Sequence, residues 1–109
     1  MPAKKNPPLS LDQCLPLLRA LADTTRLGLV RALAQGEQPV TALAEGLGIT
    51  VYNASRHLKV LRDAGLVEVD VSAQQRIYRL TTPTAAELRR NRKILELGCC
   101  SFRLDDSPG

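Results

Sequence analysis

Gly48-Ile-Thr-Val-Tyr-Asn-Ala-Ser-Arg-His-Leu-Lys-Val-Leu-Arg-Asp-Ala-Gly65 is the stretch from which the architecture of this chain follows. Thr50 is a suitable N-cap for a helix, and Gly65 is a suitable stop. Apolar residues recur at helical spacing and form one narrow stripe, namely Ile49, Ala54, Leu58 and Leu61. Hydroxyl, amide and cationic side chains fall mostly on the opposite face. Such a helix suits insertion into a DNA groove, although by itself it fits an ordinary solvated helix face equally well.

The residues before this stretch predict a helix-turn-helix. Pro39 suits the first turn of a helix over residues 40–47, whose apolar side chains are spaced to face inward. Gly48 permits a tight turn between that helix and the next one. Two short helices joined by a turn that contains glycine, with the polar face on the second helix, form the DNA-binding arrangement.

The residues after Gly65 change from helical spacing to strict alternation. Apolar and polar side chains alternate over residues 66–71 and again over residues 76–80, and the polar residues 72–75 lie between the two runs. This pattern predicts a β-hairpin, or wing, with Arg76 close to its tip.

Three further helices are predicted outside this core. Ser10 with Gln13 forms a capping box that begins a helix ending near Leu21, and Pro16 inside it is expected to kink or divide it. A second helix is expected over residues 25–34, capped by Asp23 or Thr24, and a last one from Ala85 to about Gly98. The expected fold is mainly α, with five helices and a small hairpin. Its single domain covers residues 10–104, between a flexible arm at 1–9 and a frayed tail at 105–109.

Composition supports a small helical domain with an anionic partner. The 109 residues include only 3% aromatics, so the core must consist of Leu, Val, Ile and Ala side chains. The net charge of +4 fits binding to a polyanion. No apolar run is long enough to span a membrane, and the N-terminus lacks the apolar segment of a signal peptide, so a cytoplasmic protein is expected.

Four linked motifs occur in register over roughly residues 15–81: Leu18-Arg-Ala-Leu-Ala-Asp-Thr-Thr-Arg-Leu27, Leu43-Ala-Glu-Gly-Leu-Gly-Ile49, Ser55-Arg-His-Leu-Lys-Val-Leu-Arg-Asp-Ala-Gly-Leu-Val67 and Ile77-Tyr-Arg-Leu80. Together they closely resemble the ArsR/SmtB family of bacterial winged helix-turn-helix repressors. The resemblance implies a homodimer joined through its first and last helices. Each subunit would place a recognition helix in the major groove of a palindromic double-stranded operator, and an inducer bound elsewhere would weaken DNA binding.

The resemblance carries several DNA contacts onto this chain. Ser55 and Arg56 match the family's DNA-contacting pair, and Arg56 can form a fork onto guanine or phosphate. Lys59 matches a phosphate contact, which adds affinity and salt dependence rather than sequence choice. In the wing, Arg76 is the better candidate for a minor-groove or backbone contact.

Three positions of the predicted recognition helix depart from the family. Val51, Tyr52 and Asn53 stand where the family often has Gln and small hydroxyl residues, so the choice of operator is expected to depend on them. Asn53 could read adenine, and Tyr52 could touch backbone or a thymine methyl, but each is equally compatible with plain surface. The single histidine, His57, has no Cys, Asp or Glu four residues away and is interpreted as a partly buried structural residue.

The three cysteines leave the inducer open. Cys14, Cys99 and Cys100 could supply three sulfurs to As(III), Sb(III) or another thiophilic ion, and the vicinal pair resembles that of some arsenic-sensing members. A redox disulfide between Cys14 and one tail cysteine is the second reading, because a Cys99–Cys100 disulfide would be strained. The third is purely structural packing beside Phe102 and Leu104.

These features predict a sequence-specific DNA-binding transcriptional regulator, a repressor released by an inducer that is sensed through thiols. The alternatives are a winged-helix regulator with no metal or thiol sensing and a winged-helix protein-interaction module that no longer binds DNA. An enzyme is not expected, because the chain lacks a C-x-x-C motif, a phosphate loop and an acid–base pair.

Overall fold

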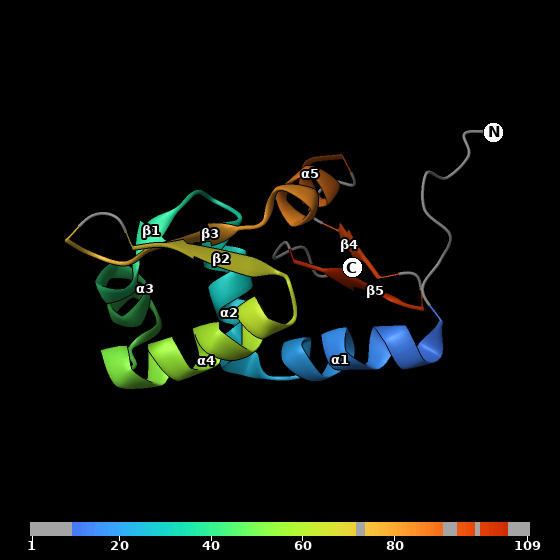
Figure 1. Cartoon of the computed structure of the whole chain (residues 1–109), viewed down its shortest axis with the longest axis horizontal. Helices are drawn as coiled ribbons and strands as arrows, with labels where there is room; N and C mark the ends of the chain where they lie inside the picture. Colours follow the sequence, from blue (N-terminus) through green and yellow to red (C-terminus); the bar gives the residue numbers. More distant parts are fainter. Residues whose placement is uncertain (1–9, 72–73, 91–93, 98, 105–109) are drawn as a thin grey trace.

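The computed structural model describes residues 10–71, 74–90, 94–97 and 99–104, and Figure 1 shows their arrangement. Along the chain the elements are α1 Leu11–Leu21, α2 Thr24–Leu33, β1 Gln38–Pro39, α3 Val40–Leu47, α4 Val51–Asp63, β2 Val67–Asp70, β3 Ile77–Leu80, α5 Thr82–Arg90, β4 Ile94–Glu96 and β5 Ser101–Arg103. The predicted arm at 1–9 and tail at 105–109 lie outside the described residues. None of the helices in the described part is long and apolar enough to cross a membrane.

The helix-turn-helix is confirmed in α3 and α4. Gly48 ends α3 with a φ of 70°, the left-handed conformation that glycine adopts without strain. The Thr50 hydroxyl then accepts a hydrogen bond from the Asn53 backbone N–H and begins α4. The apolar stripe of α4 is buried at Ala54, Leu58 and Leu61, so the rest of the helix surface faces outward.

The wing is also confirmed. Strands β2 and β3 pair antiparallel, with Val67 opposite Leu80, and β1 adds to the other side of β3 to give the order β1-β3-β2. Residues 72 and 73, between β2 and β3 in the sequence, lie outside the described part. The two strands are shorter than the alternating runs that predicted them, since residues 66, 71 and 76 lie outside the strands.

The first helix is continuous. The capping box of Ser10 and Gln13 is formed, and α1 runs through Pro16 to Leu21 in one piece. Pro16 has no backbone N–H, so the carbonyl of Asp12, four residues earlier, lacks its helical hydrogen bond. Both residues are exposed. Water can satisfy that carbonyl on this side of the helix, so the expected division into short pieces does not occur.

The predicted last helix is wrong in its extent. Helix α5 ends at Arg90, and the segment expected to continue it forms a hairpin of β4 and β5, in which Leu95 pairs with Phe102. Leu95 and Leu97 are both buried, whereas Glu96 between them is exposed. A strand places residues two apart on one face, whereas a helix turns them by about 200°. Burial of both leucines against the same surface therefore requires the strand.

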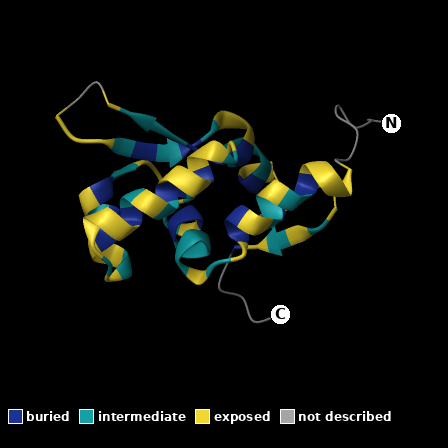
Figure 2. Cartoon of the chain, turned by 60° about the horizontal axis from the view of Figure 1, so that its bottom comes forward, coloured by how far each residue is buried: buried dark blue, intermediate teal, exposed yellow. Residues whose placement is uncertain are grey.

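The core is built of leucine, valine and alanine, as predicted. Five fully buried leucines from the first four helices form its centre: Leu21, Leu29, Leu43, Leu58 and Leu61. The C-terminal hairpin joins the same core through Leu95, Leu97 and Leu104 and lies beside α1 (Figures 1 and 2). Of the two apolar residues after the cysteine pair, Phe102 packs against the core and Leu104 is buried in it.

Candidate nucleic-acid interface and thiol cluster

The outward face of α4 presents the predicted DNA-contacting side chains. Tyr52 is 70% exposed and Val51 is 43% exposed, which is unusual for large apolar side chains. Asn53 and Arg56 are also exposed. Exposed apolar and hydrogen-bonding groups at one helix end can contact thymine methyl groups and base edges together.

Two cationic side chains on this face already have partners on their own helix. The Arg56 guanidinium carbon lies 5.8 Å from the centre of the Tyr52 ring, within the range of a cation–π contact. Lys59 Nζ lies 3.0 Å from an oxygen of Asp63. Such an exposed ion pair contributes about 0–1 kcal/mol, so it leaves Lys59 able to move to a phosphate. Ser55, by contrast, is half-buried.

The wing lies at the same end of the molecule as the N-terminus of α4 (Figure 1). Arg76 directly precedes β3 and is exposed, and its carbonyl accepts a hydrogen bond from the Val40 N–H at the start of α3. This bond ties the start of β3, at the turn end of the wing, to the helix-turn-helix. Six of the seven predicted DNA-contacting residues thus lie on α4, and the seventh, Arg76, directly precedes β3.

Arg26 was missed by the sequence reasoning, although it lies in the Asp23-Thr-Thr-Arg26 motif. Its guanidinium donates to two carbonyls at the end of α1, at 2.6 Å from Ala20 and 3.2 Å from Arg19. Its Nη1 also lies 3.1 Å from Nδ1 of the half-buried His57 on α4. Arg26 therefore joins α1, α2 and the recognition helix, and His57 has a structural partner, in agreement with its interpretation. The signal in the sequence was the position of Arg26 in the first turn of α2, where the helix dipole does not favour a positive charge.

Asp23 completes this junction as the N-cap of α2. It accepts a hydrogen bond of 3.0 Å from the Arg26 backbone N–H, and its carboxylate lies 3.8 Å from Nδ1 of His57. That backbone bond is the main reason that the pKa of Asp23 is lowered, with the charge of Arg26 adding to it. The ionised carboxylate is thus part of the folded arrangement.

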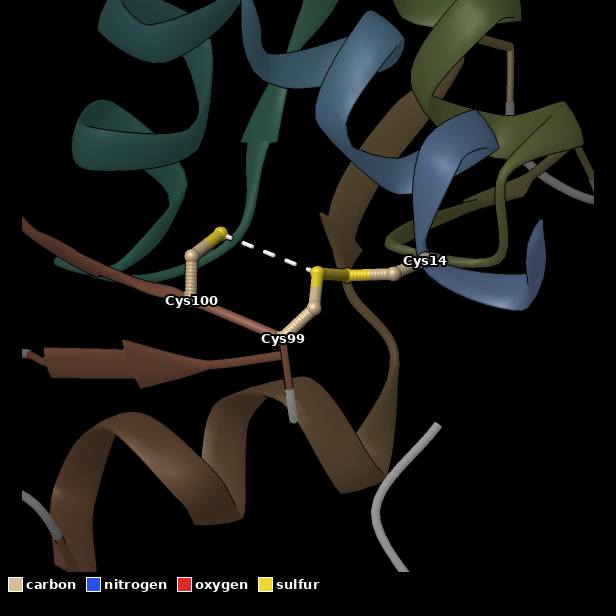
Figure 3. A group of neighbouring side chains, drawn as sticks. All are labelled: Cys14, Cys99 and Cys100. Carbon is tan, nitrogen blue, oxygen red and sulfur yellow. Dashed lines mark hydrogen bonds between the residues drawn. A yellow bond between two sulfur atoms is a disulfide. The ribbon is translucent and has the colours of Figure 1, made fainter. Parts of the chain in front are cut away.

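The three cysteines come together although 85 positions separate Cys14 from Cys99 (Figure 3). Cys14 and Cys99 form a disulfide, which is the pairing expected in the redox reading. Cys100 is a free thiol, and its Sγ lies 4.0 Å from that of Cys99. All three sulfurs lie within 4.8 Å of one another, and they are the one potential metal-binding group among the described His, Cys, Asp and Glu side chains.

The burial of the three cysteines differs in a way that matters for their chemistry. Cys14 is fully buried in α1, Cys99 is exposed in the hairpin turn, and Cys100 is intermediate. A reductant or thiol can thus reach the disulfide from the Cys99 side. Opening it would leave three thiols close enough to hold one soft ion.

Comparison with known proteins gives consistent matches. A family model described as a helix-turn-helix domain matches residues 21–70. The chain is 37% identical over 78 residues to the HTH-type transcriptional regulator Rv0324 of Mycobacterium tuberculosis. The aligned region covers 72% of this chain and 34% of that protein. It is 42% identical over 72 residues to the biofilm growth-associated repressor of Xylella fastidiosa, covering 66% of this chain and 63% of the repressor. The chain thus spans less than two thirds of either curated relative.

A solved structure with the same fold is the homodimeric winged helix-turn-helix DNA-binding domain Mb0332 from Mycobacterium bovis, titled "a possible ArsR-family transcriptional regulator". It is 35% identical, with a TM-score of 0.67, and the match covers 75% of this chain and 76% of that one. Sequence and fold therefore identify the same group of relatives.

Proposed function

The chain belongs to the ArsR/SmtB family of winged helix-turn-helix transcriptional regulators, and from this membership and the geometry of α4 we propose that it represses transcription by binding a palindromic operator in double-stranded DNA. We propose further that it acts in the cytoplasm as a homodimer, as the Mycobacterium bovis domain is, so that two recognition helices meet two half-sites. The observation that carries the proposal is the exposed face of α4, which groups Tyr52, Asn53 and Arg56 on a helix whose N-terminus lies at the same end of the molecule as the wing.

In this proposal the residues divide the work of recognition. Arg56 leaves the Tyr52 ring to contact guanine or phosphate, and Ser55 and Lys59 contact the backbone. Val51, Tyr52 and Asn53 set the operator sequence, and Arg76 extends the contact from the wing. Because phosphate contacts release counterions, affinity should fall steeply with salt.

Substitution of Arg56 tests the DNA-binding proposal. After selection of a bound sequence from random DNA, Arg56→Ala is expected to lower affinity by on the order of 1–3 kcal/mol in fluorescence anisotropy. Arg90→Ala is the matched control, because it removes the same charge from α5, where Arg90 pairs with Glu87 instead of facing the proposed interface. Equal affinities of the two variants would refute the role of Arg56, and absence of any selected sequence would favour a protein-interaction module.

We also propose that the cysteines sense an inducer by redox chemistry. In a reducing cytoplasm a disulfide is usually transient and regulatory rather than structural. The Cys14–Cys99 bond supports this reading, because it connects α1 to the C-terminal hairpin and is open to attack at the exposed Cys99. Opening and closing it would change how the hairpin is held against α1, and with it the dimer's two-state equilibrium.

The sulfur geometry favours one second candidate, a metalloid inducer. With the disulfide reduced, Cys14, Cys99 and Cys100 could supply the three sulfurs of a pyramidal As(III) or Sb(III) site, since their sulfurs lie within 4.8 Å. The two inducers are separated by operator binding of the reduced protein, measured with oxidant or with arsenite. Cys100→Ser should abolish release by arsenite but preserve the response to oxidant, whereas Cys99→Ser should abolish both. A response that survives Cys99→Ser would refute thiol sensing.

A further inference from the structure

A cavity of about 590 Å³ lies away from both the DNA-binding face and the thiols. It is formed by the end of α2 and residues 34–37 after it, by the last residues of β3, and by one side of α5, which follows β3 at the end of the sheet (Figure 1). Its volume is within the range of small-molecule sites, about 300–1,000 Å³. No step of operator recognition or thiol chemistry uses it.

The lining of the cavity combines an apolar body with a cationic edge. Leu33, Leu80 and Leu88 supply buried or nearly buried apolar surface, and Ala85 leaves space between them. Among the described residues of the wall, the two cations are Arg79 and Arg89. A ligand that fills this space is therefore expected to be mostly apolar and to place a negatively charged group at the arginines.

The two arginines differ in how far they are already neutralised. Arg79 Nε donates to Glu68 at 2.7 Å, and its Nη1 lies 3.6 Å from Glu37, the one carboxylate among the described lining residues. Arg89 is exposed, and within the described chain no carboxylate pairs with it. One guanidinium fork is thus open at the edge of an apolar cavity, the arrangement that binds a carboxylate.

We propose that this cavity binds a small organic acid, with its apolar body between α2 and α5 and its carboxylate on Arg89. An uncharged molecule of the same shape would leave the guanidinium without a partner, and a small inorganic anion would leave the apolar walls in water. Arg79 and Leu80 belong to β3, so the bound acid would touch a strand of the wing itself. The site is therefore placed to act on DNA binding independently of the cysteines.

Octanoate is a suitable probe, titrated into the whole ¹⁵N-labelled protein and followed by two-dimensional amide NMR. Saturable shifts are expected for residues 33–37, 77–80 and 85–89, with a dissociation constant below about 1 mM. Octanamide, the neutral counterpart, should bind at least about fivefold more weakly. Ala85→Phe, which fills the cavity, should weaken octanoate at least about tenfold.

The decisive comparison is Arg89→Gln against Arg90→Gln. The first should reduce octanoate affinity to that of octanamide, whereas the second removes a neighbouring charge that does not line the cavity and should change nothing. Both residues are exposed, so both variants should fold even if Ala85→Phe does not. Equal weakening by the two variants, equal binding of octanoate and octanamide, or no saturable shift up to about 10 mM would each overturn the proposal. The titration contains no DNA, so its failure would leave the proposed DNA-binding function untouched.

Discussion

Cys99→Ser is expected to destabilise the oxidised protein strongly, whereas Cys100→Ser is not. Cys99 is exposed, so replacing its sulfur by a hydroxyl has little direct effect beyond loss of the disulfide. Cys14 stays in the core as a small apolar thiol. Cys100 differs from Cys99 by one position and forms no disulfide, which makes its serine variant a matched control.

The magnitude follows from the length of chain that the disulfide closes. For a separation of 85 residues, the loop-entropy relation gives a stabilisation of about 4.6 kcal/mol at 25 °C. Measured effects of disulfides are commonly about 2–4 kcal/mol, because the unfolded chain keeps some structure. We therefore expect Cys99→Ser to lower the free energy of unfolding by about 3 kcal/mol.

Urea denaturation followed by circular dichroism measures this difference. With a slope of about 1.5 kcal/mol per molar urea, the midpoint should fall by about 2 M in Cys99→Ser. Reduced wild-type protein should unfold at the midpoint of Cys99→Ser, since both lack the same bond. A difference under about 0.5 kcal/mol between oxidised and reduced wild type would refute the reasoning, as would an equal loss in Cys100→Ser.

Three further predictions concern the helix junctions. Arg26→Gln should lower the free energy of unfolding by about 2 kcal/mol, because carbonyls at the end of α1 and His57 on α4 lose their donor; a loss under about 0.5 kcal/mol in urea denaturation would contradict it. Gly48→Ala should lower the same free energy by about 1 kcal/mol, since φ is 70° and no neighbouring atom crowds the added Cβ. Folding lowers the pKa of Asp23 below its ordinary 3.8, so its ionised carboxylate adds stability that is fully present above that value and is lost as the pH falls through the lowered pKa. Asp23→Asn keeps an N-cap acceptor but should flatten this acid limb, and an unchanged limb in stability curves against pH would count against the role of Asp23.

Local signals were enough to predict the helix-turn-helix and the wing. In α3 and α4 the caps, the glycine turn and the apolar stripe are all encoded within a few residues of where they act. The alternating residues of β2 and β3 lie close together in the sequence, so their pairing is local as well. Arg26 was missed for the opposite reason. Its three partners belong to two other helices, and one of them, His57, is 31 positions away.

The C-terminal hairpin shows where a helical pattern misleads. Leu88, Ile94, Leu95 and Leu97 can be drawn on one broad helical face, and the intervening arginines resemble its solvated side. What favours the strand is the docking of Leu95 and Leu97 on one surface and the pairing of Leu95 with Phe102. Both are contacts between segments, and tertiary contacts of this kind override local preference.

The same hairpin explains why the apolar stripe of α1 could be read in two ways. The stripe consists of Leu11, Cys14, Leu15, Leu18 and Leu21, which is more apolar surface than an outer helix needs, so part of it suits the contact with a second subunit that the family resemblance implies. In the structure Cys14 and Leu21 are fully buried within the chain, Cys14 by the disulfide to the hairpin, whereas Leu11 stays 63% exposed. At Cys14 the stripe is therefore covered by the chain's own C-terminal hairpin, whereas its outer end at Leu11 is open to a partner. Because the disulfide holds the covering hairpin at Cys14, opening it would change the size of the apolar surface that α1 can offer to a second subunit.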